Sequence, residues 1–138
     1  MTSSSVSGKL ALLRDNLEKL EQIPQVSLEE FLSDFRNLDS VLHRLQTSVQ
    51  VLIDLATYAT ARRGLGTPAT SVDALEKLEQ AKLLPVGSAQ RFTPIFGFRN
   101  RVVHLYDRLD PAIVYRILTE NRRDLEDLAI LLTTALGE

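Results

Sequence analysis

The chain has 138 residues, of which 44% are hydrophobic and 25% charged, and its formal net charge is −2. These proportions are those of one soluble globular domain and exclude extensive disorder. The sequence contains no cysteine, which excludes disulfide bonds, thiolate nucleophiles and thiolate metal sites and fits a cytoplasmic location. The slightly negative charge gives no global attraction to nucleic acid or anionic lipid, so any nucleic-acid binding requires a local patch.

The first eight residues, MTSSSVSG, are polar and lack the apolar core of a signal peptide. We expect residues 1–8 to be a flexible N-terminus and residues 9–138 to form a single helical domain. No window approaches the roughly 18 apolar residues that a membrane span needs, so we expect no membrane partner.

A first helix is predicted at about residues 6–22, because leucines at positions 10, 13, 17 and 20 repeat at helical spacing and Pro24 follows. Ser27 and Glu30 then match a capping box at the start of a second helix. Val26 and Phe31 occupy the positions of a hydrophobic staple across that start.

The second helix is predicted to be long, since apolar residues continue at helical spacing as far as Ala56 and the segment ends in ARRGLG. Gly64 is available as its C-cap. An unbroken helix would have about 36 residues and measure about 54 Å, which is unusual in a small domain. It either bends near residues 35–40 or spans the bundle and projects into a partner.

A loop, GLGTPATS, separates this helix from a short third one. Ser71 is expected to cap the segment VDALEKLEQAKLL, which Pro85 and Gly87 terminate. A fourth helix is predicted over about residues 88–106, with a kink or a restart at Pro94 and Gly97.

The last helix is predicted over residues 111–136, because Asp110 and Pro111 form a favourable N-cap and N1 pair. No strand pattern or internal repeat is present in the sequence. We therefore predict an all-α fold, a single-domain antiparallel bundle of four to five helices with one long second helix.

The segment GFRNRVVHLYDRLDP, residues 97–111, carries the residues best suited to chemistry. Histidine serves as a general acid or base near neutral pH, and arginine donates a planar set of N–H groups to phosphate. An arginine–histidine pair alone is a weak signal, since an amphipathic helix with solvent-facing polar residues gives the same pattern.

Helical geometry separates these residues. Arg99 and His104 lie about 140° apart around a straight helix, and His104 and Tyr106 about 160° apart. Asn100 and Arg101 each share a face with His104. A common site therefore requires a kink that frees Arg99, a helix that ends near Tyr106, or a second protomer that supplies the missing groups across a two-fold axis.

The decapeptide GFRNRVVHLY resembles the signature of the HEPN superfamily and is closest to the HepT-like toxins, whose motif is arginine, a polar residue, three residues, histidine, any residue and tyrosine. The segment LHRLQTSVQVLIDLATYATARRGLGTPAT resembles the second long helix of that family, and LDPAIVYRILTENRRDLEDL resembles its last helix. The resemblance covers nearly the whole chain from about Leu10. Tyr58, where the family often has histidine, and Pro94 depart from the pattern.

The resemblance implies a toxin of a HepT/MntA toxin–antitoxin system, of type II or VII, that acts as a metal-independent endoribonuclease without a cofactor. Carried over by position, the catalytic residues are Arg99, Asn100 and His104. Arg101, which is not part of the family motif, is a candidate RNA contact beside them. The motif tyrosine is Tyr106, which an MntA-like nucleotidyltransferase antitoxin would modify with AMP. The family also implies a homodimer whose two motifs line one cleft.

Two other functions stay open at this stage: a non-catalytic HEPN module that binds nucleotide or a partner, and a plain helical adaptor. Of the remaining polar residues, His43 is expected at the surface, and Arg62 and Arg63 as charges at a helix C-terminus. Asp54 is either a buried hydrogen-bonding partner or part of the cleft. No metal site is visible in the sequence.

Overall fold

A computed structural model describes the backbone of residues 3–105 and 110–137 and the side chains of residues 5–100 and 110–137. These residues form helices and contain no strand, which confirms the predicted all-α fold. The helices are α1 (Ser3–Gln22), α2 (Leu28–Leu32), α3 (Phe35–Arg62), α4 (Ser71–Gln80), α5 (Ser88–Leu105), α6 (Pro111–Arg116) and α7 (Arg122–Leu136). A π-helical turn, η2 (Ile117–Asn121), joins α6 to α7.

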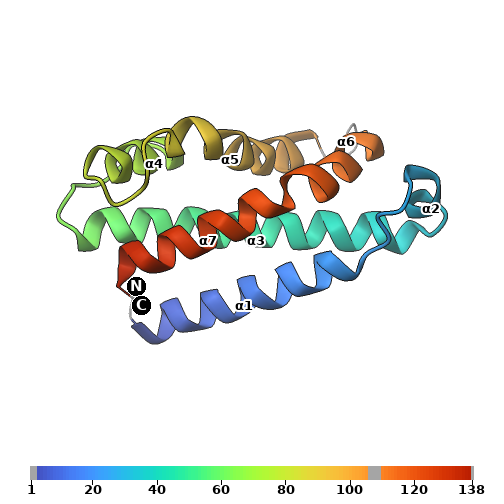
Figure 1. Cartoon of the computed structure of the whole chain (residues 1–138), viewed down its shortest axis with the longest axis horizontal. Coiled ribbons are helices and arrows are strands. Elements are labelled where there is room, and N and C mark those ends of the chain that lie inside the picture. The colour runs from blue at the N-terminus through green and yellow to red at the C-terminus, as the bar shows by residue number, and fades with distance from the viewer. Residues whose placement is uncertain (1–2, 106–109, 138) are drawn as a thin grey trace.

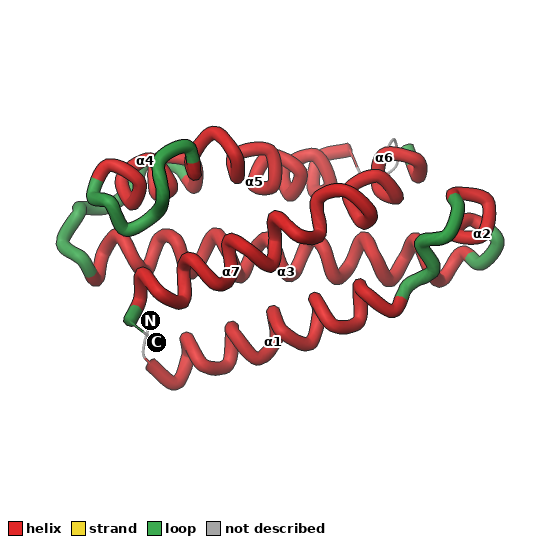
Figure 2. Tube along the Cα trace, in the orientation of Figure 1, coloured by secondary structure: helices red, strands yellow, loops and turns green. Residues whose placement is uncertain are grey.

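The long helices α1, α3, α5 and α6–α7 run up and down the bundle, and the start of α1 and the end of α7 lie at the same end of it (Figure 1). Loops are short and lie mainly at the two ends of the bundle (Figure 2). Helix α3 is central and contacts each of the other α-helices. Most of its apolar side chains are buried, and Leu45, Leu52 and Leu55 are each 0% exposed, so the hydrophobic core is organised around α3.

Helix α1 begins at Ser3, earlier than the expected residue 6 and within the segment that we predicted to be flexible. Val6 is 0% exposed, because it is part of the core. The flexibility of residues 1–8 stays a prediction.

The start of the second helical segment is only partly as predicted. The Ser27 hydroxyl accepts a hydrogen bond of 3.1 Å from the Glu30 backbone N–H, which confirms Ser27 as the N-cap. The predicted hydrophobic staple is wrong, since Val26 is 85% exposed. Phe31 packs instead against Tyr115, with ring centroids 5.2 Å apart, and the Tyr115 hydroxyl donates to the Gln25 carbonyl.

The long second helix is broken, and the break falls at residues 33–34, just before the expected bend. Asp34 caps the new helix by accepting from the Arg36 backbone N–H at 3.0 Å. The same carboxylate pairs with the Arg36 guanidinium at 2.8 Å, and this side-chain hydrogen bond lowers the pKa of Asp34. Helix α3 still has 28 residues, so the bundle retains a long central helix.

The N-cap of α4 is Thr70 rather than Ser71. The Thr70 hydroxyl accepts from the Asp73 backbone N–H at 3.0 Å, and the Asp73 carboxylate accepts from the Ala69 backbone N–H at 2.9 Å. At the last helix the predicted cap is confirmed, since Asp110 accepts from the Ala112 backbone N–H at 2.9 Å.

Candidate active site on helix α5

The first half of α5 is anchored by aromatic and aliphatic side chains on its inner face. Phe92, Ile95, Phe96 and Phe98 are at most 7% exposed. Burying side chains of this size contributes about 1.5–3 kcal/mol each to stability. This half of the helix therefore fixes the position from which the motif extends.

Arg91 holds α5 against α7. Its guanidinium donates to the Asp124 carboxylate at 2.8 and 3.1 Å and to Asp127 at 2.6 Å, and it lies over the Phe92 ring at 4.7 Å. The hydrogen bonds to Asp127 and Asp124 raise the pKa of Arg91. A guanidinium can satisfy two carboxylates at once because its donors form a planar fork.

Of the kink or restart predicted at Pro94 and Gly97, the restart is wrong, because α5 continues as one helix over residues 88–105. Proline has no backbone N–H, so the Gln90 carbonyl lacks its usual helical partner. Gln90 is exposed, and solvent can bond this carbonyl in place of the missing donor. The loss is therefore tolerated without ending the helix.

The motif residues occupy different sides of α5. Arg99 follows Phe92 and Ile95 at helical spacing, and it is accordingly half-buried. Its Nε is buried and has no hydrogen-bond partner among the described residues. Asn100, one position further, is exposed.

Residues 101–105 continue the helix, but the side chains of Arg101 and His104 lie outside those described, and so does Tyr106 altogether. In a continuous helix the position of His104 is about 40° from that of Asn100 and about 140° from that of Arg99. The backbone therefore places Asn100, Arg101 and His104 on one side of α5 and Arg99 on another. That Arg99 and His104 act together in one site stays a prediction.

The other polar residues considered in the sequence have structural surroundings. Asp54 accepts from Lys9 at 2.8 Å and from Gln50 at 2.9 Å, so it is a hydrogen-bonding partner in the contact between α1 and α3. Arg63 donates twice to the Ala135 carbonyl, at 2.8 and 3.0 Å, which satisfies a free carbonyl near the end of α7. His43 and Arg62 are exposed on α3, as expected.

One feature beside the motif has no signal in the sequence. The π-helical turn η2 faces α5 across a small cavity of about 70 Å³, whose lining includes Pro94, Phe98 and Asn121. π-helical turns recur near functional sites, because the extra residue changes the register of the helix. Phe98, which immediately precedes Arg99, lines this cavity together with Asn121 of the turn.

Among the described side chains, no group of three or more histidines, cysteines, aspartates and glutamates is arranged to hold a metal ion. The helices of the described ranges are also too short or too polar to cross a membrane.

The chain is thus a helical bundle that carries the arginine, asparagine and histidine of the motif on helix α5. The family model described as ribonuclease HepT-like matches residues 13–132, and the chain belongs to this family. The predicted family, and the ribonuclease class that comes with it, are confirmed.

Two curated relatives are nucleases. The tRNA nuclease HepT of Aphanizomenon flos-aquae is 28% identical over 114 residues, covering 83% of this chain and 78% of the relative. The mRNA nuclease HepT of Shewanella oneidensis is 27% identical over 121 residues, which cover 88% of this chain and 90% of the relative.

A solved structure shows the same fold in a complex. The tri-AMPylated Shewanella oneidensis HEPN toxin, bound to an MNT antitoxin, matches with a TM-score of 0.82 at 25% identity, covering 97% of this chain and 99% of that one.

Proposed function

We propose that this chain is the toxin of a toxin–antitoxin pair and cleaves cellular RNA in the cytoplasm without a metal ion. The observation that carries the proposal is the match of the ribonuclease family model to residues 13–132, on a chain that carries Arg99, Asn100 and His104 on one helix. The two nuclease relatives and the antitoxin-bound toxin structure support it. Its partners are RNA, a nucleotidyltransferase antitoxin of the MntA type and a second copy of the chain.

In the proposed reaction the 2′-hydroxyl of the RNA attacks the adjacent phosphorus. His104 accepts the proton of that hydroxyl as the new P–O2′ bond forms, and a proton goes to the O5′ atom as the P–O5′ bond breaks. Arg99 stabilises the negative charge that develops on the phosphate oxygens, and Asn100 orients His104 or the phosphate. The products are a 2′,3′-cyclic phosphate and a 5′-hydroxyl.

Arg101 supplies a further contact to the RNA backbone in this proposal, and Tyr106 is the residue that receives AMP. Adding AMP to Tyr106 places a bulky anion beside the catalytic residues, which blocks RNA by steric exclusion and like-charge repulsion. The antitoxin therefore silences the toxin without removing any catalytic side chain.

The test incubates purified protein with total RNA in excess EDTA and compares the wild type with His104→Ala and Arg99→Ala. His43→Ala and Arg123→Ala are the matched controls, since both residues are exposed on other helices. We expect cleavage by the wild type and the controls, with cyclic phosphate ends, and a loss of about 10²–10⁴-fold in His104→Ala. Undiminished cleavage by His104→Ala would refute the proposed site.

An inactive wild type calls for the intact mass of the same sample. An added AMP that disappears in Tyr106→Phe but persists in Tyr58→Phe identifies a silenced toxin. An unmodified and inactive protein that still binds nucleotide or RNA favours the non-catalytic HEPN module instead.

The second protomer is proposed because Arg99 and His104 lie on different sides of one helix. Mixing the inactive Arg99→Ala and His104→Ala proteins tests it, since a heterodimer then contains one site with both residues intact. Recovery to about a quarter of wild-type activity is expected from random pairing of the two proteins. If both residues act from the same chain, the mixture remains inactive.

A further inference from the structure

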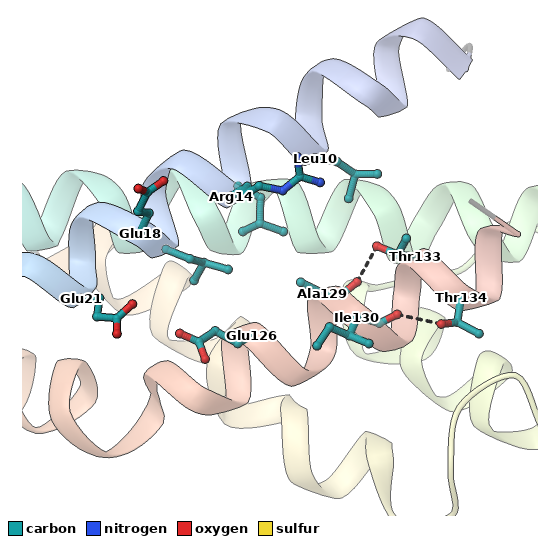
Figure 3. Close-up of a pocket in the computed structure, with 11 residues that line it drawn as sticks. Leu10, Arg14, Glu18, Glu21, Glu126, Ala129, Ile130, Thr133 and Thr134 are labelled. Atoms are coloured by element: carbon teal, nitrogen blue, oxygen red, sulfur yellow. Dashed lines mark hydrogen bonds between the residues drawn. The ribbon is translucent and has the colours of Figure 1, made fainter.

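A groove of about 600 Å³ runs between α1 and α7 (Figure 3). Its apolar lining consists of side chains from both helices: Leu10, Leu13, Leu17, Ala129 and Ile130. Ile130 is 65% exposed, although most large apolar side chains of the bundle are buried. An exposed apolar strip bordered by polar residues is typical of a protein interaction site.

The packing of α1 explains why the groove is open. Asn16 of α1 is 2% exposed, donates to the Thr47 hydroxyl at 2.8 Å and accepts from Arg44 at 3.1 Å. Lys9 pairs with Asp54 at 2.8 Å. These polar contacts hold α1 on α3, and the opposite flank of α1 faces α7 across the groove.

Charge is distributed unevenly along the groove. Glu18 and Glu21 from α1 and Glu126 from α7 lie toward one end, where Figure 3 shows their carboxylates around the same opening. The basic residue of the lining is Arg14, in the middle. This excess of carboxylates repels the phosphates of RNA, so the groove suits a cationic partner.

Toward the other end of the groove, the two threonine hydroxyls are engaged within α7. The hydroxyls of Thr133 and Thr134 donate to the Ala129 and Ile130 carbonyls of their own helix, at 2.7 and 3.1 Å, as Figure 3 shows. The groove is thus apolar along most of its length and acidic at one end.

We infer that this groove binds an amphipathic helix of a partner protein that carries lysine or arginine at one of its ends. Residues 10–21 of α1 extend over about 17 Å, which corresponds to about three turns of a bound helix. Leucine-like residues spaced three and four apart would enter the groove, and the basic end would lie beside Glu18, Glu21 and Glu126.

A second copy of this chain fits the groove less well. Two copies paired through this groove would combine six glutamates with two arginines, Arg14 from each copy, and this excess of negative charge opposes association. A foreign helix with basic residues neutralises the same carboxylates. Charge complementarity therefore favours a different protein as the occupant.

The groove is separate from the proposed catalytic helix. Figure 1 shows α1 and α5 on opposite sides of the bundle, with α3 and α7 between them. A helix bound between α1 and α7 therefore leaves α5 uncovered. Partner binding and RNA cleavage can then be altered independently.

The test uses synthetic 14-residue helical peptides and fluorescence anisotropy. Two peptides share a leucine stripe at helical spacing and carry three lysines at either the N-terminal or the C-terminal end, a third carries three glutamates, and a fourth is a shuffled sequence. We expect one lysine peptide to bind with a Kd of about 10–100 μM and at least about 10-fold more tightly than the glutamate and shuffled peptides.

Three variants locate the binding. Ile130→Glu should weaken it at least about 10-fold, whereas Val86→Glu, at a 98% exposed site elsewhere, should not change it. The double variant Glu21→Lys, Glu126→Lys should reverse the preference toward the glutamate peptide. Failure of every peptide to bind, or equal binding to Ile130→Glu, would overturn the inference.

Sedimentation of the wild type and Ile130→Glu distinguishes the other occupant. A wild-type dimer that Ile130→Glu converts to monomer would show that a second copy covers the groove, which also overturns the inference. The inference does not depend on RNA cleavage, because peptide binding is measured without RNA.

Discussion

The two halves of helix α5 are held by different means. Residues 88–98 are fixed by buried aromatic side chains and by the bridge from Arg91 to Asp124 and Asp127. Residues 99–105 begin with the half-buried Arg99, whose Nε lacks a partner among the described residues, and the exposed Asn100. One continuous helix thus joins a segment that stabilises the fold to a segment that carries the proposed chemistry.

This division has a physical advantage. A catalytic arginine or histidine must remain available to the substrate, so its hydrogen-bonding groups cannot all be paired within the core. The buried N–H of Arg99 costs about 1–3 kcal/mol if nothing bonds it. The first half of α5 supplies buried packing that offsets this cost.

The largest expected effect is in the first half. Phe92 is 0% exposed, and Phe92→Ala should lower the free energy of unfolding by about 3–5 kcal/mol, since it removes buried surface and leaves a cavity. Urea unfolding followed by circular dichroism measures this change. Val86→Ala, at an exposed site, is the control; an equal loss there would contradict the anchoring role of Phe92.

The second half should show the opposite behaviour. Asn100→Ala is expected to reduce RNA cleavage about 10–100-fold, because the residue shares a face with His104, while stability changes by less than about 0.5 kcal/mol. Gln90→Ala, an exposed position earlier on the same helix, should leave both quantities unchanged. Loss of stability without loss of cleavage would place Asn100 with the anchoring residues.

The Arg91 bridge is expected to contribute less than the aromatic side chains. Its side chain is 45% exposed, so solvent weakens the ion pairs, and Arg91→Gln should cost about 0.5–1 kcal/mol. The difference from wild type should shrink in 1 M NaCl, where charges are screened over about 3 Å. Thermal unfolding at low and high salt measures this difference in stability, with Arg116→Gln as the exposed control. A loss of stability that does not respond to salt would indicate that Arg91 acts by packing on Phe92 instead.

Local sequence signals predicted the helices well and their junctions less well. Ser27 and Asp110 were identifiable as caps because their hydrogen bonds are to residues two or three positions away. The prediction of a hydrophobic staple was wrong because Phe31 packs on Tyr115, and this contact joins residues that are far apart in the sequence. At α4 the sequence did contain the correct N-cap pattern, which is a threonine at position 70 followed three residues later by an aspartate.

The chemistry of the site was predictable and its assembly was not. Residue types and spacing identify Arg99, Asn100 and His104, because each side chain has a distinct role in phosphate and proton chemistry. The spacing of the motif already places Arg99 and His104 about 140° apart around a helix, but it does not encode how a second chain would bring the two residues together. Pro94 illustrates the same limit, since the helix continues through it by leaving the Gln90 carbonyl to solvent.

The smallest expected effect on stability concerns the ion pair between Asp34 and Arg36. Both residues belong to the start of α3, so this pair, unlike the Arg91 bridge, does not connect two helices. Arg36 lowers the pKa of Asp34 below 3.8, so the folded state favours the charged carboxylate. The resulting stability is present above pH 3.8 and is lost as the pH falls through the lower folded-state pKa. Asp34→Asn keeps a good N-cap but removes the charge. Its urea midpoint should be slightly below that of the wild type at pH 7, and the two midpoints should converge as the pH falls below the lowered pKa of Asp34. A difference that persists at the lowest pH would assign the effect to capping rather than to charge.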